Sequence, residues 1–220
     1  MSKNKKEKVV LFDLDGTLID STPAILNGFY HSFEAIAYDF KGGDEDITKH
    51  IGYPLEVMFE NIGVEEDKIE SAVLAYKEKY RHIFKEKTIL ISDAIASIDL
   101  ASTIARLGIV TTKTTKYTIE LLEYFGVNEH FEAIVGFQEV ENHKPHPEPI
   151  YKALDMMDVS HSTHDIWMIG DTKLDLIASK KAGINSVGVL CGYGKLEDLE
   201  PHSENITKST FEAVEIIKSL

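Results

Sequence analysis

The chain has 220 residues, 43% hydrophobic and 27% charged, which is long and apolar enough for the core of a globular protein and excludes a disordered chain. Its formal net charge of −14 at pH 7 argues against binding to nucleic acid or to an acidic membrane, because both are themselves negative. No stretch approaches the roughly 18 apolar residues of a membrane span, and the start of the chain lacks a signal-peptide core, so we expect a cytoplasmic protein without a membrane anchor.

Short apolar runs rich in β-branched residues alternate with longer segments of helical spacing along most of the chain. This alternation predicts an α/β fold built on a doubly wound parallel sheet. Two predicted helices, over residues 115–125 and 173–182, end at Gly126 and Gly183, since glycine favours the left-handed conformation that terminates a helix. The predicted strands are Val9 to Phe12, Gly108 to Val110, Ala133 to Val135, Ile166 to Ile169 and Ser186 to Leu190.

The interval between the first two predicted strands has a different character. Residues 20–87 show helical spacing with no strand pattern, beginning at the capping pair Thr22 and Pro23. An apolar stripe follows, formed by Ile25, Phe29, Phe33 and Ile36, and a second stripe is formed by Ile69, Val73, Tyr76, Tyr80 and Ile83. We therefore predict an α/β core of residues 1–19 and 88–220 that carries an inserted helical domain of residues 20–87.

Acidic residues follow two of the predicted strands. Asp13 and Asp15 come directly after the first strand, where an isolated pair could equally be an acidic turn or a calcium-type loop. Asp171 and Asp175 follow the strand that ends at Ile169, and the carboxyl ends of parallel strands meet at one edge of a sheet. Carboxylates gathered there repel one another unless a cation is present, and an all-oxygen ligand set suits Mg²⁺. The sequence therefore predicts a magnesium site.

Two further segments carry groups that a phosphoryl group needs. Thr111 and Thr112 follow the strand that ends at Val110 and lead into a helix, so they offer hydroxyl and backbone N–H groups to an anion. Lys144 stands in a segment stiffened by three prolines, and a rigid cation can neutralise a phosphate in transfer. Each feature by itself is also common as a helix cap or a surface turn.

Taken together, these segments resemble the four motifs of the haloacid dehalogenase superfamily, and in particular its phosphoglycolate phosphatase-like branch. The motifs occur in order and at similar spacing, and the resemblance covers nearly the whole chain. They are Asp-Leu-Asp-Gly-Thr at 13–17, Val-Thr at 110–111, Lys-Pro-x-Pro-x-Pro at 144–149 and Gly-Asp-Thr-x-x-Asp at 170–175. By this resemblance the helical insert is the small cap domain that closes over the site and selects the substrate.

The resemblance implies a Mg²⁺-dependent phosphatase that forms an aspartyl-phosphate intermediate. Asp13 is implied as the nucleophile, and Asp15 as the acid that protonates the leaving group and then the base that activates water. The other implied roles are phosphoryl binding by Thr111, Thr112 and Lys144, metal binding by Asp13, the backbone carbonyl of Asp15 and Asp171, and support of the metal site by Asp175.

The substrate is expected to be a small phosphorylated metabolite. Gly52 lies in a segment that resembles the substrate loop of phosphoglycolate phosphatases, although a turn between helices explains it equally well, and phosphoglycolate is the first candidate. An inorganic pyrophosphatase and a phosphosugar mutase are alternatives, but Thr17 stands where mutase relatives usually carry valine. A non-catalytic binding domain is disfavoured, because binding alone does not need Asp15. We expect a monomer or a homodimer.

Overall fold

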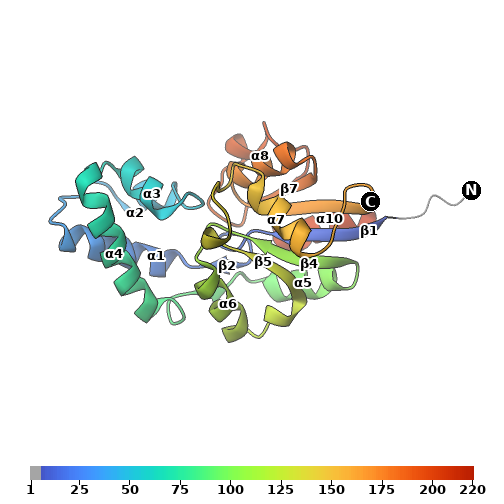
Figure 1. The fold of residues 1–220 in the computed structure, drawn as a ribbon, viewed down its shortest axis with the longest axis horizontal. Coiled ribbons are helices and arrows are strands. Elements are labelled where there is room, and N and C mark those ends of the chain that lie inside the picture. Colours follow the sequence, from blue (N-terminus) through green and yellow to red (C-terminus); the bar gives the residue numbers. More distant parts are fainter. Residues whose placement is uncertain (1–5) are drawn as a thin grey trace, which may run out of the picture.

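The computed structural model describes residues 6–220, and Figure 1 shows an α/β core joined to a separate group of helices. Residues 1–5 of the predicted core lie outside the described residues. The five predicted strands are confirmed, four of them beginning two or three residues earlier than expected. In spatial order, the sheet consists of β5 (Phe131–Val135), β4 (Ala105–Val110), β1 (Glu7–Phe12), β6 (His164–Gly170), β7 (Asn185–Val189) and β8 (Ile206–Thr207).

All neighbouring strands in this sheet are parallel. The chain runs outward from β1 through β4 to β5, returns to β6 on the other side of β1, and then runs outward to β8. Phe12 pairs with Ile109 of β4 and with Ile169 of β6, so these three strands end at the same level. Ligands of open α/β sheets bind at the carboxyl ends of the strands where the order reverses. The residues that follow β1, β4 and β6 therefore meet at such a place.

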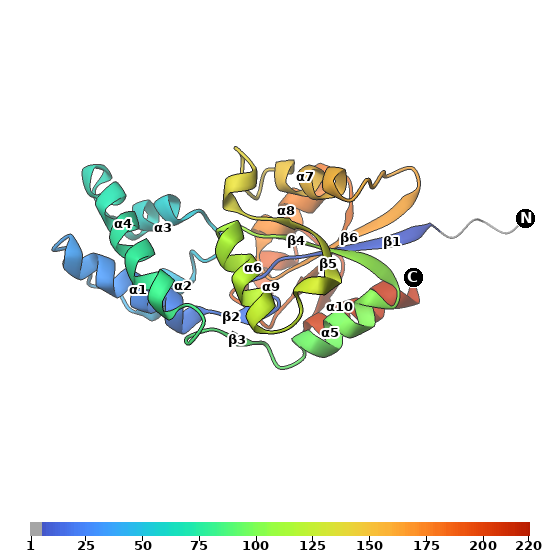
Figure 2. The ribbon, with the colours of Figure 1, turned by 60° about the horizontal axis from the view of Figure 1, so that its bottom comes forward.

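Helices cover both faces of the sheet (Figure 2). Val9 and Leu11 belong to a buried cluster with α7 (Glu148–Met156) and α8 (Lys173–Ala182). Val10 and Phe12 belong to the cluster on the other face, which contains residues of α5 (Ala94–Ser102), α6 (Thr115–Tyr124) and α10 (Thr210–Ser219). Since β1 is buried on both faces, its sequence is a continuous apolar run rather than an alternation. The remaining core helices are η1 (Asn128–His130), η2 (Phe137–Glu139) and α9 (Leu196–Leu199).

Four helices form the cap, α1 (Thr22–Ala35), α2 (Asp44–Thr48), α3 (Leu55–Ile62) and α4 (Glu66–Ile83). The predicted stripe on α1 packs against α3 and α4. The ring of Phe29 lies 4.5 Å from that of Phe59 on α3 and 5.4 Å from that of Tyr76 on α4. Gly28 permits this contact, because a Cβ atom there would lie 2.5 Å from the Tyr76 ring. Within the described residues, none of the helices has both the length and the apolar character needed to cross a membrane.

A short antiparallel pair of strands joins the cap to the core. β2 (Ile19–Asp20) pairs with β3 (Ile89–Leu90), one strand at each end of the cap helices. The expectation of no strand in residues 20–87 is therefore wrong at Asp20, because a strand of two residues is too short to show any periodicity. The limits of the cap at residues 20 and 87 stay a prediction.

Candidate active site

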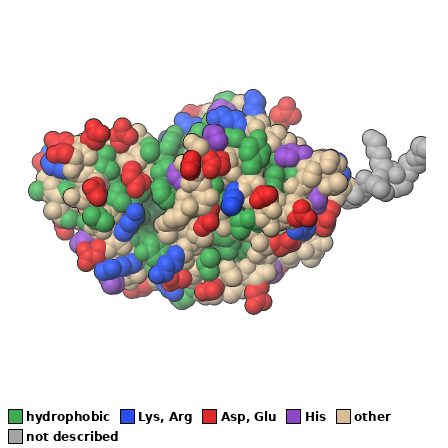
Figure 3. Space-filling model, viewed as in Figure 1, with side chains coloured by type: hydrophobic (Ala, Val, Ile, Leu, Met, Phe, Trp, Pro, Cys, Tyr) green, Lys and Arg blue, Asp and Glu red, His purple; other side chains and the backbone are tan. Residues whose placement is uncertain are grey.

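A cavity lies between the cap and the carboxyl edge of the sheet, and Figure 3 shows a depression between these two lobes. Five of the residues predicted from the sequence line it, namely Asp13, Asp15, Gly52, Thr111 and Thr112. Lys144 and Asp171 are not part of the cavity wall and lie buried beside Asp13. Segments far apart in the sequence thus meet here, as the parallel register requires.

Lys144 is buried between two carboxylates. Its Nζ atom lies 2.9 Å from Oδ1 of Asp13 and 2.5 Å from Oδ1 of Asp175, and it donates a hydrogen bond of 2.9 Å to the carbonyl oxygen of Val110. Burial alone would lower the pKa of Lys144, but the two carboxylates raise it above its ordinary value. The lysine therefore stays charged, with all three of its N–H donors in use.

Asp13 occupies an environment that disfavours its charge. Burial raises the pKa of Asp13 from 3.8 to about 7, opposed by the charge of Lys144 and reinforced by the nearby carboxylate of Asp175. One cation is therefore not enough to offset the desolvation of the buried carboxylates around it. Further positive charge is needed for Asp13 to be fully ionised at neutral pH.

Asp171 is enclosed by the backbone. Thr17 Oγ1 donates to its Oδ1 at 3.1 Å, and the backbone N–H of Tyr193 donates to its Oδ2 at 2.8 Å. A Cβ atom at Gly16 or at Gly192 would lie 2.3 or 2.2 Å from Asp171 Oδ2, and Gly16 also has a φ of +83°. These two glycines are required because the backbone approaches the carboxylate so closely.

Asp175 accepts three hydrogen bonds from the protein, one more than Asp171, and one of its donors is an ammonium. Oδ1 accepts from Lys144, and Oδ2 accepts from the backbone N–H of Thr172 at 3.0 Å and from its hydroxyl at 2.7 Å. This contact also caps the first turn of α8. Asp175 is therefore suited to hold Lys144 and the entrance of α8 in place.

The side chain of Asp15 points away from this group of carboxylates. Its Oδ1 accepts a hydrogen bond from the hydroxyl of Ser21, and its Oδ2 lies 3.0 Å from Nζ of Lys113. Lys113 also donates a hydrogen bond of 2.7 Å to the hydroxyl of Tyr80, on the cap helix α4. The sequence analysis did not include Lys113 among the site residues, although it directly follows the two threonines of the second motif.

The phosphate-binding candidates take different positions on the cavity wall. Thr111 is buried, and its Oγ1 accepts a hydrogen bond of 3.2 Å from the backbone N–H of Lys113, which shapes the turn before α6. Gly52 lies on the cap loop before α3 with a φ of +106°, and a Cβ atom there would lie 3.3 Å from Thr172 of the core. The cap loop thus reaches the core across the mouth of the site.

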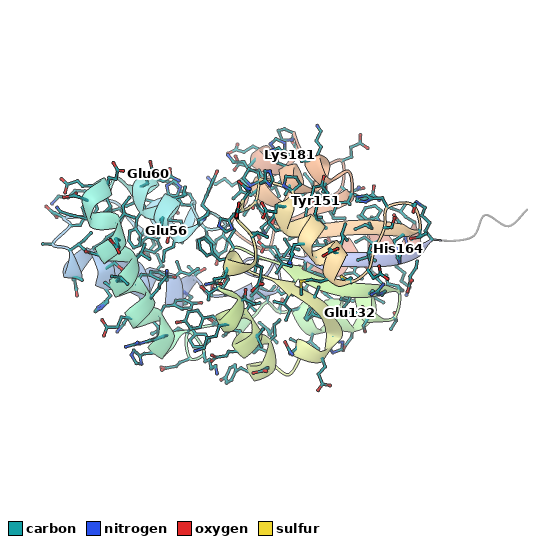
Figure 4. The ribbon with its side chains drawn as sticks, in the orientation of Figure 1. Glu56, Glu60, Glu132, Tyr151, His164 and Lys181 are labelled. Atoms are coloured by element: carbon teal, nitrogen blue, oxygen red, sulfur yellow. The ribbon has the colours of Figure 1, made fainter. Side chains whose placement is uncertain are left out.

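Aromatic residues complete the cap side of the cavity. The sequence pattern predicts Tyr76 and Tyr80 as packing residues of a helical stripe; both are buried in the cap, and both also line the cavity. Glu56 of α3, labelled in Figure 4, adds a negative charge on the cap side. Periodicity could not separate these two uses, because a buried stripe and a cavity wall share the same helix face.

A family model described as haloacid dehalogenase-like hydrolase matches residues 10–189, a range that contains all the site residues predicted from the sequence. The chain belongs to this family. The resemblance seen in the four sequence motifs is thereby confirmed, and this haloacid dehalogenase-like protein is an enzyme of the phosphatase type.

Named relatives and solved structures agree with this assignment. The haloacid dehalogenase-like chain is 35% identical over 188 residues to pyrophosphatase PpaX of Halalkalibacterium halodurans, covering 84% of this chain and 83% of the relative. It superposes with a TM-score of 0.88 on a haloacid dehalogenase-like hydrolase from Bacteroides fragilis, at 27% identity, covering 94% and 100% of the two chains. A structure from Haemophilus somnus titled as a predicted phosphoglycolate phosphatase, 21% identical with a TM-score of 0.84 and covering 97% and 99%, shares the fold.

The carboxylates of this haloacid dehalogenase-like enzyme fit a Mg²⁺ ion. Oxygen atoms of Asp13, Asp171 and Asp175 lie within 4.8 Å of one another, and all three side chains are buried. Burial, reinforced by Asp13 and Asp175, raises the pKa of Asp171 well above its ordinary value, so a cation bound beside these carboxylates would favour its ionised form. Asp175 already accepts a hydrogen bond from the ammonium of Lys144, whereas both donors to Asp171 are uncharged, so Asp171 is the better placed of these two to bind the ion.

The metal-free protein is expected to lose stability as the pH rises from about 5 to about 8, and Mg²⁺ is expected to restore it. The pKa of Asp13 is raised to about 7 in the folded state, so the stability contributed by its protonated form is complete below its ordinary pKa of 3.8 and is lost as the pH rises through 7. Thermal denaturation in chelator and in Mg²⁺ at both pH values measures this. A melting temperature in chelator that does not fall between them would contradict the prediction.

Proposed function

We propose that this protein is a Mg²⁺-dependent phosphatase that transfers the phosphoryl group of a small substrate to Asp13 and then to water. The observation that carries the proposal is the pairing of Asp13, at the wall of the cavity, with the buried ammonium of Lys144 at 2.9 Å. A carboxylate is a nucleophile once ionised, and a fixed cation beside it neutralises charge on the phosphoryl group.

In the first half of the reaction, an oxygen of Asp13 attacks phosphorus and the bond from phosphorus to the leaving oxygen breaks. Asp15 gives its proton to that oxygen. In the second half, Asp15 takes a proton from water, the water oxygen attacks phosphorus, and the bond from phosphorus to Asp13 breaks, which releases inorganic phosphate. Asp13, Asp171 and the backbone carbonyl of Asp15 would hold Mg²⁺, which would supply positive charge that favours ionised Asp13 and offsets the phosphoryl charge.

Other residues hold the phosphoryl group and exclude water. Thr111 and Thr112 offer hydroxyl groups at the cavity wall, and Lys144 opposes the charge that develops on the phosphoryl oxygens. Asp175 keeps Lys144 in place through its hydrogen bond of 2.5 Å. The cap loop at Gly52 lies against Thr172, so it limits the access of bulk water from that side.

Inorganic pyrophosphate is our first candidate substrate, ahead of phosphoglycolate. The curated relative that is 35% identical is named a pyrophosphatase, which supports the alternative of the sequence analysis over its first choice. A phosphosugar mutase and a non-catalytic binding domain have less support. The expectations of a monomer or homodimer, of no nucleic-acid binding and of a cytoplasmic location stay predictions.

The test is phosphate release from pyrophosphate, phosphoglycolate, sugar phosphates and nucleotides, each with Mg²⁺ and with chelator. We expect pyrophosphate to have the highest kcat/KM, by about tenfold or more over sugar phosphates. Chelator should abolish release, and restoring Mg²⁺ to the same sample is the control. Equal release in chelator would refute the role of the metal, and isomerisation of a sugar phosphate without its hydrolysis would favour the mutase.

A further inference from the structure

Lys113 is a nearly buried cation on the wall of the cavity with partners from both lobes. Its side chain is 8% exposed, and its Nζ lies 3.0 Å from Oδ2 of Asp15 in the core. The same nitrogen donates to the hydroxyl of Tyr80 on the cap at 2.7 Å and lies 5.0 Å from the centre of that ring. Two partners on opposite sides hold the ammonium in one place.

The hydrogen bonds of Lys113 differ from those of Lys144. An ammonium has three N–H donors, and Lys144 uses all three on Asp13, Asp175 and the carbonyl of Val110. Within residues 6–220, the ammonium of Lys113 has two such partners, Asp15 and Tyr80. Lys113 can therefore donate a further hydrogen bond to an anion that enters the cavity.

Lys113 is positioned to contact the leaving group rather than the transferring phosphoryl group. Asp15, which in the proposed reaction gives its proton to the leaving oxygen, lies 3.0 Å from the ammonium. The other lysine on the cavity wall, Lys77 of α4, is exposed to solvent, and Glu56 on the cap is negative. A buried cation is thus available beside the leaving oxygen.

We propose that Lys113 is a specificity-determining residue that binds the anionic part of the leaving group, so that the site selects substrates whose leaving group carries its own negative charge. Such substrates are a diphosphate or the phosphate ester of a hydroxycarboxylic acid. The inference rests on the proposed function, because it assigns the leaving side of the cavity from the role of Asp15.

Tyr80 makes this selection depend on the cap. Its hydroxyl accepts from Lys113, so one of the two contacts that hold the ammonium forms only while α4 lies against the core. Burial, and after it the negative charge of Asp15, raises the pKa of Tyr80 well above its ordinary value of 10.0, so its phenol stays neutral and does not compete with an anionic ligand by repulsion. The cap therefore both encloses the leaving group and orients the cation that binds it.

The test compares kcat/KM for pyrophosphate, phosphoglycolate and ethyl phosphate in the wild type and in Lys113→Met. Removing a charged donor should lower kcat/KM for the two substrates with an anionic leaving group by roughly 10- to 100-fold, and for ethyl phosphate, whose leaving group is neutral, by only about threefold. Lys113→Arg should recover part of the loss. Lys116→Met, which changes an exposed lysine in the first turn of α6, should leave all three values unchanged.

The opposite pattern would overturn the inference. If Lys113 only oriented Asp15, ethyl phosphate would lose at least as much activity as pyrophosphate, because an alcohol is the poorer leaving group and depends more on the proton from Asp15. Equal losses for all three substrates, or no loss, would likewise refute a role in selecting charge. Thermal denaturation of each variant establishes that it is folded.

A binding measurement distinguishes failure of this inference from failure of the proposed function. Calorimetry with pyrophosphate and Mg²⁺ compares Asp13→Asn with Asp13→Asn/Lys113→Met, neither of which is expected to turn substrate over. A dissociation constant roughly tenfold or more higher in the double variant supports the inference, and equal constants overturn it. If the wild type releases phosphate from no substrate, the proposed function fails, and the binding result alone decides the role of Lys113.

Discussion

Asp13→Asn is expected to lower phosphate release by about 10⁴-fold or more, because an amide cannot form the phosphoryl intermediate that a carboxylate forms. The substitution keeps the shape of the side chain, so substrate binding should persist. Phosphate release with Mg²⁺ at saturating pyrophosphate measures the effect. Retention of more than about a tenth of the activity would refute Asp13 as the nucleophile.

The same variant should remain folded, and in chelator at high pH it should be at least as stable as the wild type. Burial raises the pKa of Asp13 to about 7, so above this pH the metal-free wild type bears the cost of an ionised buried carboxylate, which the amide avoids. We expect Asp13→Asn in chelator to melt no lower than the wild type at about pH 8. Asp99→Asn, an exposed position on α5, is the matched control and should change neither activity nor melting temperature.

Lys144→Met is expected to reduce both activity and stability. The substitution leaves Asp13 and Asp175 buried without the ammonium that lies between them, and removing one partner of a buried ion pair costs about 3–5 kcal/mol of the free energy of unfolding. For a chain of this size, the melting temperature should fall by roughly 10 °C. Phosphate release should fall by about 10³-fold, because the charge on the phosphoryl group is no longer opposed.

The pH dependence distinguishes lost charge pairing from lost packing in this variant. Without Lys144, whose charge lowers the pKa of Asp13, Asp13 binds its proton still more tightly in the folded state, so the cost of ionising it appears as the pH rises and is relieved in acid. The difference in melting temperature should therefore be larger at about pH 8 than at about pH 5. Lys152→Met, at an exposed position of α7, is the control. A melting temperature near that of the wild type at the higher pH would contradict the account.

The main strands and the convergence of the acidic residues could be predicted because each depends on local sequence and on one general property of parallel sheets. The run from Val9 to Phe12 is continuous because β1 is buried on both faces. Its end, and the ends of β4 and β6, lie at one edge because neighbouring strands are parallel and in register. The sequence by itself therefore determined the α/β class, the helical insert and the meeting of the motifs.

The direction and the partners of the side chains were decided only by the tertiary structure. Tyr80 lies 33 positions before Lys113, and periodicity could assign it only to a buried helix face. Asp15 turns towards Lys113 rather than towards Asp171, and both oxygens of Asp175 accept hydrogen bonds, because of neighbours that the fold supplies. A motif specifies which groups arrive at the edge of the sheet. Which of them pair, and which remain able to bind a substrate, depends on contacts between segments that are distant in the chain.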